Sequence, residues 1–449
     1  MTRFPFRALA LAACLACTGA HAVDLIAVAK IAANATDLSG LSAPLENGVN
    51  GDRLGGIGSG LAWAGGSTFL ALPDRGPNAA AWNSAVDDTS SYIPRFHTFD
   101  FALTPTPVNG LPYTLTPTLR STTLLYAVTP LAYGPVTPAL NNGSKYYFSG
   151  RSDNFDPATS SASAADARLD TESIRVSRTG KTVYITDEYG PYVYQFDRVT
   201  GARGRSFALP AGFEVAHKAA TGAAEISGNT RGRVANKGME GLAITPDGKT
   251  LVGFMQSPLA QDGGDGGRAN RIVTIDIATG TTHQYVYDNW LADMSKTYNS
   301  SEILALNSHE FLVLERDGKG LGDDSKAVVK RLYKIDIAGA TDVGPLNLQG
   351  EAALLPYAVP KSLFLDIKAK LVAAGIADTQ IPAKIEGAAF GADIVVNGQT
   401  RHTLYVASDN DFLLTSPKGL ATPNQIFVFT FTDADLGGSQ FVPQSVTPL

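Results

Sequence analysis

The feature that most constrains the fold of this 449-residue chain is a recurring unit of short strands joined by glycine-containing turns. Residues 171–204 show the unit most clearly, because apolar and polar residues alternate along successive segments and Gly180 lies in the turn between the first two. Alternation bounded by such turns is typical of antiparallel strands. The unit begins with an acidic residue, Glu172, and its second strand ends in the pair Asp187 and Glu188.

Related units occur before and after this one. The five copies open at Ser59, Glu172, Glu240, Glu302 and Glu386. Repeats built from three or four short strands indicate a β-propeller, in which each repeat forms one blade around a central axis. We therefore predict an all-β propeller that occupies residues 23–449 as a single domain. Five repeats are visible, and the long interval between the first two copies favours six blades, with five as the alternative.

The two ends of the chain offer a way to close the ring. Residues 25–31 alternate as a strand does, and the last copy ends near Phe431 without a clear fourth strand. Pairing of the two ends would complete the last blade and remove its exposed sheet edges. One helix is also predicted, over residues 360–375, where apolar residues recur at helical spacing before a glycine.

Residues 1–22 resemble a secretory signal. Arg3 and Arg7 give a positive start, a short apolar run follows, and residues 20–22 have the small-x-small pattern of a cleavage site. We therefore expect a periplasmic or secreted protein, with a lipoprotein signal modified at Cys14 as the alternative. Both cysteines of the chain lie in this segment, so the mature chain would contain no disulfide and no cysteine nucleophile.

The charge balance limits the classes of partner. The chain has 36 lysines and arginines against 42 aspartates and glutamates, and its formal net charge is −6. Because it has no run of five or more basic residues, nucleic acid is a poor partner. No apolar stretch after the signal is long enough to span a bilayer. We expect a monomer with a small-molecule partner and no membrane span.

Two sets of acidic residues stand at repeated positions. The first set opens the copies, and equivalent residues of different blades should meet around the axis. It comprises Glu172, Glu240, Glu302 and Glu386. The second set ends the second strands. It comprises Asp74, Asp187, Glu188, Glu315, Asp317 and Asp409.

Clustered carboxylates raise one another's pKa or bind cations. Oxygen ligands in this number suit Ca²⁺, with another divalent cation as the alternative. The predicted metal ligands are Glu172, Glu240, Glu302, Glu386, Asp74, Asp187, Asp317 and Asp409. A purely structural interpretation stays open, in which these acids accept backbone N–H groups and hold adjacent blades together.

Two arginines follow strand-end acids, Arg75 after Asp74 and Arg316 after Glu315, and Asn410 follows Asp409. Guanidinium groups pair well with phosphate and carboxylate, so we predict that Arg75 and Arg316 bind an anionic substrate, with Asn410 beside them. The alternative for the arginines is pairing with the neighbouring carboxylates. The sequence contains neither a Gly-x-Ser-x-Gly elbow nor a His-Glu-x-x-His motif.

Eight motifs together resemble those of a bacterial secreted family known as "esterase-like activity of phytase". They are PDRGPN at 73–78, TDEYGP at 186–191, GMEGLA at 238–243, QSPL at 256–259, SEILAL at 301–306, LERDG at 314–318, KIEG at 384–387 and SDNDF at 408–412. The resemblance covers roughly residues 50–433. It implies a propeller related to calcium-dependent phytases, in which metal ions in the mouth bind phosphate and activate water. Two runs of the true propeller phytases, Asp-Asp-Pro-Ala and Asn-Asn-x-Asp-x-Arg, do not occur in this sequence.

The functional hypothesis is a secreted, metal-assisted hydrolase of phosphate or other anionic esters, with Glu188 or Glu315 as the base. Two alternatives stay open. One is a non-catalytic envelope binding protein that calcium stabilises, and the other is a lactonase-like sugar hydrolase.

Overall fold

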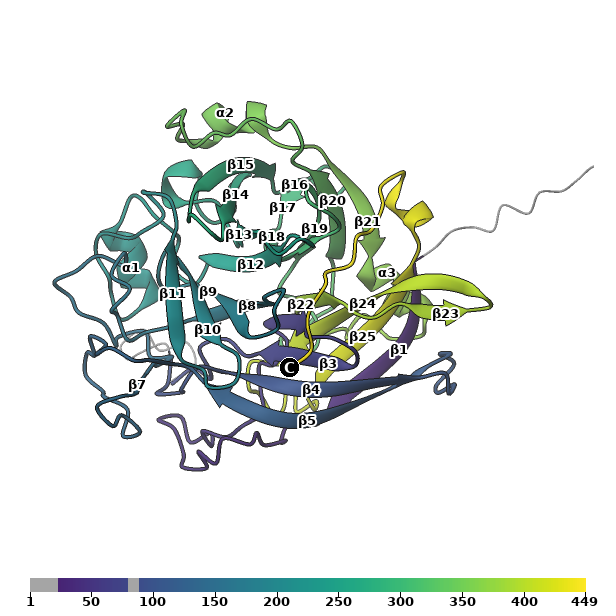
Figure 1. Ribbon diagram of the computed structural model, residues 1–449, viewed down its shortest axis with the longest axis horizontal. Coiled ribbons are helices and arrows are strands. Elements are labelled where there is room, and N and C mark those ends of the chain that lie inside the picture. Colours follow the sequence, from purple (N-terminus) through teal and green to yellow (C-terminus); the bar gives the residue numbers. More distant parts are fainter. Residues whose placement is uncertain (1–22, 80–88) are drawn as a thin grey trace, which may run out of the picture.

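Four four-stranded antiparallel sheets and one of five strands stand around one axis, so the protein is a five-bladed β-propeller (Figure 1). The computed structural model describes residues 23–79 and 89–449, and the predicted signal at 1–22 lies outside the described residues. The all-β propeller is confirmed, with the smaller of the two blade numbers that the sequence left open. The described part of the long interval between the first two copies forms loops and a short ribbon, β6 (Tyr126–Ala127) with β7 (Tyr146–Tyr147).

Blades 1 to 4 each use four strands in chain order, from the axis outward. Blade 1 comprises β2 (Gly60–Trp63), β3 (Thr68–Leu72), β4 (Arg95–Thr104) and β5 (Thr114–Leu124). Blade 2 comprises β8 (Thr171–Val176), β9 (Thr182–Asp187), β10 (Tyr192–Asp197) and β11 (Arg203–Ala208). Blade 3 comprises β12 (Met239–Ile244), β13 (Thr250–Met255), β14 (Ala269–Asp276) and β15 (Thr282–Asp288). Blade 4 comprises β18 (Asn299–Ala305), β19 (Glu310–Arg316), β20 (Lys330–Asp336) and β21 (Lys361–Asp366).

Blade 5 joins the two ends of the chain. It comprises β22 (Lys384–Phe390), β24 (Gln399–Asp409), β25 (Asn424–Phe431) and β1 (Asp24–Ile31), with β23 (Ile394–Val396) paired to the far part of β24. Strand β1 runs antiparallel to β25, from Asp24 opposite Thr430 to Ile31 opposite Asn424. The predicted closure of the ring by residues 25–31 is therefore confirmed.

The prediction of a helix over residues 360–375 is wrong for its first part and correct for its second. Its first part is β21, which pairs with β20 as the outer strand of blade 4. Only the second part is helical, as α3 (Ile367–Ala373), which begins where the Asp366 side chain accepts the N–H of Ala369 at 2.9 Å. Residues 361–366 form a strand because their pairing with β20 satisfies the backbone N–H and C=O groups of β20. A longer helix would leave those groups of β20 exposed on a sheet edge.

Further short elements lie in the connections. They are α1 (Gly222–Gly228), α2 (Glu351–Leu354), the 3₁₀ turns Ala260–Asp262, Leu355–Tyr357 and Asp433–Leu436, and the ribbon β16 (Trp290–Leu291) with β17 (Lys296–Thr297). Within residues 23–79 and 89–449, no helix combines the length and the apolar character needed to cross a membrane.

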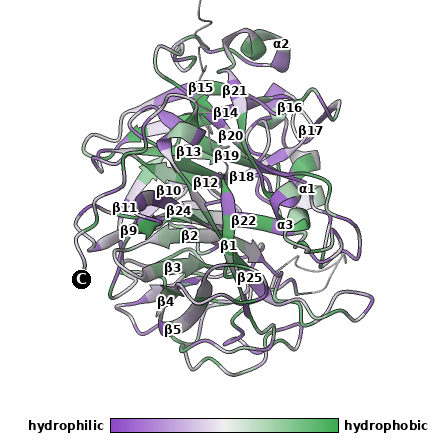
Figure 2. Cartoon of the chain, turned by 90° about the vertical axis from the view of Figure 1, so that its right-hand side faces the viewer, coloured by the Kyte–Doolittle hydropathy of each residue, from purple (hydrophilic) through white to green (hydrophobic). Residues whose placement is uncertain are grey.

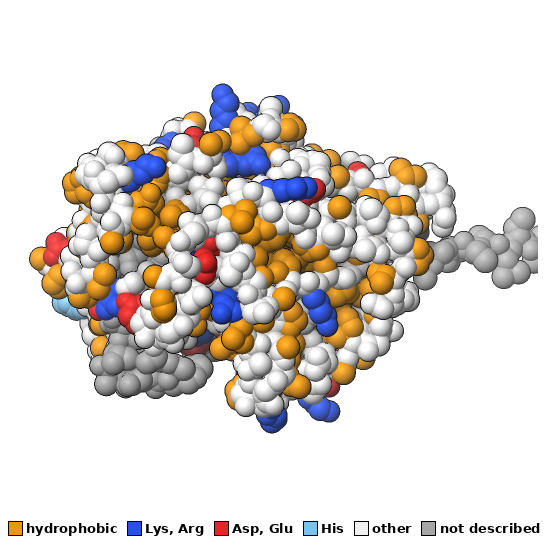
Figure 3. Space-filling view, turned by 90° about the horizontal axis from the view of Figure 1, so that it is seen from below, with side chains coloured by type: hydrophobic (Ala, Val, Ile, Leu, Met, Phe, Trp, Pro, Cys, Tyr) orange, Lys and Arg blue, Asp and Glu red, His pale blue; other side chains and the backbone are white. Residues whose placement is uncertain are grey.

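The hydrophobic core consists of layers between neighbouring blades. Between blades 1 and 2, for example, Leu70 and Phe96 pack in one buried cluster with Ile174 and Val183. The interface of blades 3 and 4 is built in the same way. Figure 2 shows hydrophobic residues along the strands and more hydrophilic residues in the connections. On the face shown in Figure 3, acidic side chains are scattered singly. Burial between blades fixes the strands that carry the site.

The two ends of the central channel differ. Its far end is covered by the C-terminal segment, where Val442 donates its N–H to the Leu306 carbonyl at 2.8 Å and Thr447 to that of Arg178 at 2.9 Å. Figure 1 shows this segment ending in front of the blades. The opposite end holds the acidic residues.

Candidate functional site: an acidic mouth

Strand pairing collects the acidic residues at one end of the propeller. Thr171 at the start of β8 lies opposite Asp187 at the end of β9, and Lys384 at the start of β22 lies opposite Asp409 at the end of β24. The start of an inner strand and the end of its neighbour therefore share one end of the sheet. We call the carboxylates gathered there the acidic mouth. It comprises Asp74, Asp170, Glu172, Glu188, Glu240, Glu386, Asp409 and Asp411.

A β-bulge near the start of four inner strands sets which residues face this end. The pairing register shifts in β8, β12, β18 and β22 after Thr171, Met239, Ser300 and Ile385. The residues that follow these shifts are Glu172, Glu240, Ser301 and Glu386. Bulges re-aim side chains and are common beside active sites. Blade 4 thus contributes a serine where three other blades contribute a glutamate.

The sequence predicted that Glu302 is equivalent to the other three glutamates. This prediction is wrong, because Glu302 lies one residue further along β18. Its carboxylate pairs with Arg175 at 2.8 Å and accepts the hydroxyl of Ser173 at 3.0 Å. The N–H groups of Leu242 and Ile303 also donate to it. Glu302 is therefore fully engaged as a lock between blades, deep in the channel.

The first carboxylate group of the mouth is Asp170, Glu172 and Glu188. Oxygen atoms of the three lie within 4.8 Å of one another. Burial raises the pKa of Glu188 to about 8, and the negative charge of the nearby Asp170 adds to this rise. Burial and the carboxylates around it, with Glu240 foremost, raise the pKa of Glu172 well above its usual range. These groups favour binding of a proton or a cation.

Glu240 extends the first group toward blade 3. Its Oε1 accepts the Gln256 amide at 2.8 Å, whereas its Oε2 is buried without a hydrogen-bond partner among the described residues. Burial and the neighbouring Glu188 and Glu386 raise the pKa of Glu240 well above its usual range. A buried oxygen left unpaired costs free energy. The position therefore suits a positively charged ligand.

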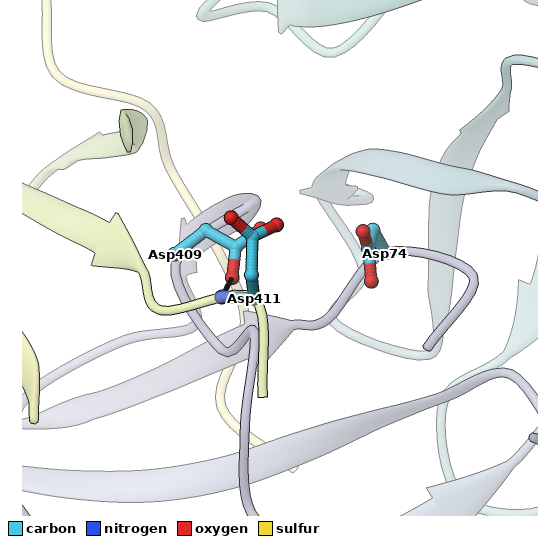
Figure 4. Close-up of side chains that lie close together, drawn as sticks. All are labelled: Asp74, Asp409 and Asp411. Carbon is cyan, nitrogen blue, oxygen red and sulfur yellow. Dashed lines mark hydrogen bonds between the residues drawn. The ribbon is translucent and has the colours of Figure 1, made fainter. Parts of the chain in front are cut away.

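The second carboxylate group, Asp74, Asp409 and Asp411, lies on blades 1 and 5. Oxygen atoms of the three lie within 4.8 Å of one another. Figure 4 shows Asp409 beside Asp411, with the Asp411 N–H donating to Asp409 at 2.6 Å, and Asp74 across from them. Lys384 pairs with Asp411 and lies 3.6 Å from Asp409. Burial raises the pKa of Asp74 to about 7, although Arg75 and Lys384 oppose the rise.

The two arginines predicted to bind substrate border the mouth and pair with its carboxylates. Arg75 Nη1 lies 3.0 Å from Asp170. Arg316 pairs with Glu386 and donates through Nε to Ser301 Oγ at 2.9 Å. Their fixed guanidinium groups offset part of the negative charge and leave the mouth with more carboxylates than cations.

Glu315, the second predicted base, is not brought to the mouth. Side chains alternate along a strand, so Glu315 points away from the face that its neighbour Arg316 occupies. It accepts the hydroxyl of Tyr287 and the ammonium group of Lys361. Burial raises the pKa of Glu315 to about 7, against the effect of Lys361. Of the two predicted bases, Glu188 lies in the mouth and Glu315 does not.

Three other predicted site residues hold loops. Asp187 accepts two backbone N–H groups, at 3.0 and 3.1 Å. Asp317 pairs with Lys330 at 2.7 Å and accepts two further N–H groups at 2.8 and 2.9 Å. Asn410 accepts the N–H of Gly56 at 2.9 Å and donates to a backbone carbonyl at 2.9 Å. These contacts hold the loops that form the rim of the mouth.

The sequence analysis left Asp170, Asp411 and Lys384 out of the site. A signal for the two aspartates was present in the sequence. Asp170 stands two residues before Glu172, and Asp411 stands two residues after Asp409. Each of these aspartates is thus close in the sequence to a predicted metal ligand. Lys384 has no such signal, because its role depends on the register between β22 and β24.

Fold and site together define the class of protein, a five-bladed β-propeller with a cluster of buried carboxylates at one end of its channel. Residues 52–412 match the Phytase-like family described as "Esterase-like activity of phytase". The chain belongs to this family, and the resemblance of its eight motifs is thereby confirmed.

A curated relative is an uncharacterized secreted protein of Arthroderma benhamiae, 35% identical over 177 residues. The match covers 33% of this chain and 34% of the relative, so the chain spans about a third of the length of that relative. Similar solved structures include the periplasmic gluconolactonase PpgL of Pseudomonas aeruginosa, with 12% identity, TM-score 0.32, and coverage of 90% of this chain and 99% of that chain. A putative 6-phosphogluconolactonase of Bacteroides fragilis has 12% identity, TM-score 0.33, and coverage of 88% and 96%.

Proposed function

We propose that this protein is a secreted, metal-dependent hydrolase of phosphate or other anionic esters. The observation that carries the proposal is the buried, unpartnered Oε2 of Glu240, which stands next to carboxylates whose pKa values are raised. A cation would satisfy that oxygen and relieve the repulsion between its neighbours. Membership of the phytase-like family supports a hydrolase.

The donor set of the mouth fits a hard divalent cation, because its free ligand atoms are carboxylate oxygens. Asp170, Glu172 and Glu240 would hold one ion beside Glu188, and Asp74, Asp409 and Asp411 offer a second group of ligands. Ca²⁺ is the proposed ion, with another divalent cation as the alternative. A bound ion would act as a Lewis acid and lower the pKa of a coordinated water.

Three side chains of the mouth would act on the substrate itself. Glu188 would take the proton of the attacking water, and a cation beside it would favour the ionised form that this role needs, because burial otherwise raises its pKa to about 8. Arg75 beside blade 1 and Lys384 of blade 5 would bind the negative charge of an ester. Glu315 has no role in this mechanism, because Tyr287 and Lys361 engage it elsewhere.

Export is part of the proposal. The positive start and cleavage pattern of residues 1–22 support it, and the Arthroderma benhamiae relative carries the word secreted in its name. A mass measurement on protein from the producing cell tests cleavage after residue 22. A mass that retains this segment would contradict the proposed export.

A hydrolase panel tests the activity. Phosphate monoesters, carboxylic esters and sugar lactones are offered to chelator-treated protein, with and without added Ca²⁺. We expect hydrolysis of anionic esters that requires the cation. Glu188→Gln should lower kcat by about 10²-fold or more, as loss of a general base does. Glu315→Gln, which removes a buried carboxylate outside the mouth, is the matched control and should retain most of the activity.

Two outcomes would contradict the proposal. Hydrolysis that is equally fast in chelator would exclude the metal. Calcium binding without hydrolysis of any panel member would favour the alternative of a non-catalytic, calcium-stabilised propeller.

A further inference from the structure

A second cavity opens beside the acidic mouth, next to helix α1. Its volume is about 310 Å³, including the part that is open to solvent. The lining includes Arg75, Arg168, Tyr189, Glu225, Arg233 and Asn236. Three of these six side chains are arginines and one is acidic, so guanidinium groups dominate this part of the wall.

Arg168 and Arg233 are fixed in the wall by a shared carboxylate. Glu225 lies 3.0 Å from Arg168 Nη2 and 2.5 Å from Arg233 Nη2. Arg168 also donates to the Ser152 carbonyl at 2.9 Å, and Arg233 donates to that of Tyr189 at 3.1 Å. Burial raises the pKa of Glu225, but the two arginines more than offset this and hold it below its usual value. Glu225 thus bridges two buried guanidinium groups, and the Asp187 and Glu188 carboxylates also interact with Arg168 and Arg233, respectively.

Arg75 connects this cavity to the mouth. It lines the cavity, and its Nη1 pairs at 3.0 Å with Asp170, a member of the first carboxylate group. Its side chain is 13% exposed. On the other side, Arg233 binds the carbonyl of Tyr189, the residue after Glu188. A molecule in the cavity would therefore lie directly beside the carboxylates proposed to perform hydrolysis.

We infer that this cavity is a subsite for an oxyanion, phosphate or carboxylate, that the substrate carries in addition to the ester that is cleaved. The link to a substrate rests on the proposed function, whereas binding of the oxyanion does not. Guanidinium groups recognise both oxyanions through paired N–H donors. The preferred substrates are then esters with a second negative group, and neutral esters are poorer ones.

Asn236 allows a test that leaves the arginines untouched. It is exposed, lines the cavity and has φ of 56°, a conformation that Asn and Asp both adopt. Asn236→Asp therefore adds a negative charge with little change of shape. Asn397, exposed in the turn between β23 and β24 with φ of 52°, provides the matched control Asn397→Asp.

The experiment is calorimetric titration of chelator-treated protein with inorganic phosphate and, separately, with acetate. Chelation ensures that neither anion binds through a cation in the mouth. We expect the parent and Asn397→Asp to bind the same oxyanion equally, and Asn236→Asp to bind it at least fivefold more weakly. The ligand that binds more tightly identifies the oxyanion. Equal affinity in the parent and Asn236→Asp, or no binding of either ligand, would overturn the inference.

Arg168→Gln is the second variant, because it removes one of the two guanidinium groups on Glu225. Its control is Arg271→Gln, which removes a buried arginine paired with Asp262 at 2.6 Å in blade 3. Both variants should lose stability, but only Arg168→Gln should lose oxyanion binding. Unchanged binding in both would show that the arginines are structural and would refute the subsite.

Kinetics separate the subsite from the proposed function. Mono-4-nitrophenyl succinate and 4-nitrophenyl acetate differ by a carboxymethyl group, which carries a negative charge. Asn236→Asp should lower kcat/KM at least fivefold for the succinate ester and leave the acetate ester unchanged. If neither ester nor any panel member is hydrolysed but Asn236→Asp weakens oxyanion binding, the subsite stands and the proposed function fails. If hydrolysis occurs and Asn236→Asp changes neither oxyanion binding nor kinetics, the proposed function stands and the subsite fails.

Discussion

Arg175 and Glu302 form an ion pair of 2.8 Å that closes the central channel. Both side chains are buried, and Arg175 also donates to the carbonyls of Leu61 at 2.7 Å and Ile303 at 3.1 Å. The arginine comes from blade 2, and its partners come from blades 1 and 4. Buried charges are tolerated where pairing and hydrogen bonds are complete. The pair thus separates the acidic mouth from the covered end of the channel.

Glu302→Gln should be strongly destabilising, because it leaves the charge of Arg175 buried without its partner. We expect the free energy of unfolding in urea to fall by about 3–5 kcal/mol. Asp100→Asn, which breaks the exposed pair with Arg120, is the control and should cost less than about 1 kcal/mol. Because Glu302 lies outside the mouth, calcium should still raise the melting temperature of the variant. A variant as stable as the parent, or one without a calcium response, would contradict this assignment.

The architecture could be predicted from the sequence because strand alternation and glycine turns are local signals. The ring closure by residues 25–31 followed from the missing fourth strand of the last repeat. The strand β21 could not be told from a helix, because Leu363, Phe364 and Ile367 fit a helical face until the open edge of β20 is known. The number of blades could not be predicted because the chain between the first two repeats contains long loops. Strand periodicity gives no information about the structure of such loops.

The site was predictable only as far as the repeats could be aligned. Glu172, Glu240 and Glu386 were placed at equivalent positions, and the structure brings them to one mouth. The bulge register moved Glu302 out of that set by one residue. Glu315 was missed as a lock because Tyr287 and Lys361 come from distant parts of the chain. Such partners are fixed by tertiary packing and leave no local pattern.

Calcium removal should lower the melting temperature. A cation that binds only the folded state at a hundredfold excess over Kd adds about 2.7 kcal/mol, which for a chain of this size is a rise of a few degrees. Ca²⁺ should restore the melting temperature better than Mg²⁺, because it accepts more oxygen ligands in flexible geometry. Glu240→Gln and Asp170→Asn should shrink the calcium shift, and Glu315→Gln should not. Scanning calorimetry with and without chelator measures the shift in melting temperature. A parent protein that shows no shift would contradict metal binding in the mouth.

The metal-free protein should lose stability as pH rises from about 4 to about 8. Burial raises the folded-state pKa of Asp74 to about 7 and of Glu188 to about 8, whereas unfolded carboxyl groups titrate near 4. Between these values the folded state binds more protons than the unfolded state, so the stabilisation present at low pH is lost as pH rises. Calcium should reduce this loss by balancing the ionised carboxylates. Urea unfolding at four pH values, in calcium and in chelator, measures the free energy of unfolding. Parallel pH curves in the two conditions would contradict binding of the cation.

His97 should act in the opposite direction. It is buried in β4, with Nδ1 3.0 Å from the hydroxyl of Thr122 and with Nε2 unpartnered among the described residues. Burial lowers its pKa to about 3, with Arg95 adding to the effect and Asp37 opposing it. Unfolded histidine titrates near 6.5, so between about pH 6.5 and 3 only the unfolded state binds the proton. Its contribution to stability is therefore complete above about pH 6.5 and falls as pH decreases, by about 1.4 kcal/mol per unit.

His97→Gln tests this directly, because glutamine does not titrate and can still bond to Thr122. Between pH 6.5 and 4.5 the parent should lose about 2 kcal/mol more unfolding free energy than the variant. His283→Gln removes an exposed histidine and should follow the parent curve. Urea unfolding at the two pH values measures each loss. If His97→Gln and the parent lose the same free energy, His97 is protonated in the folded protein within this range, and acid sensitivity must come from other groups.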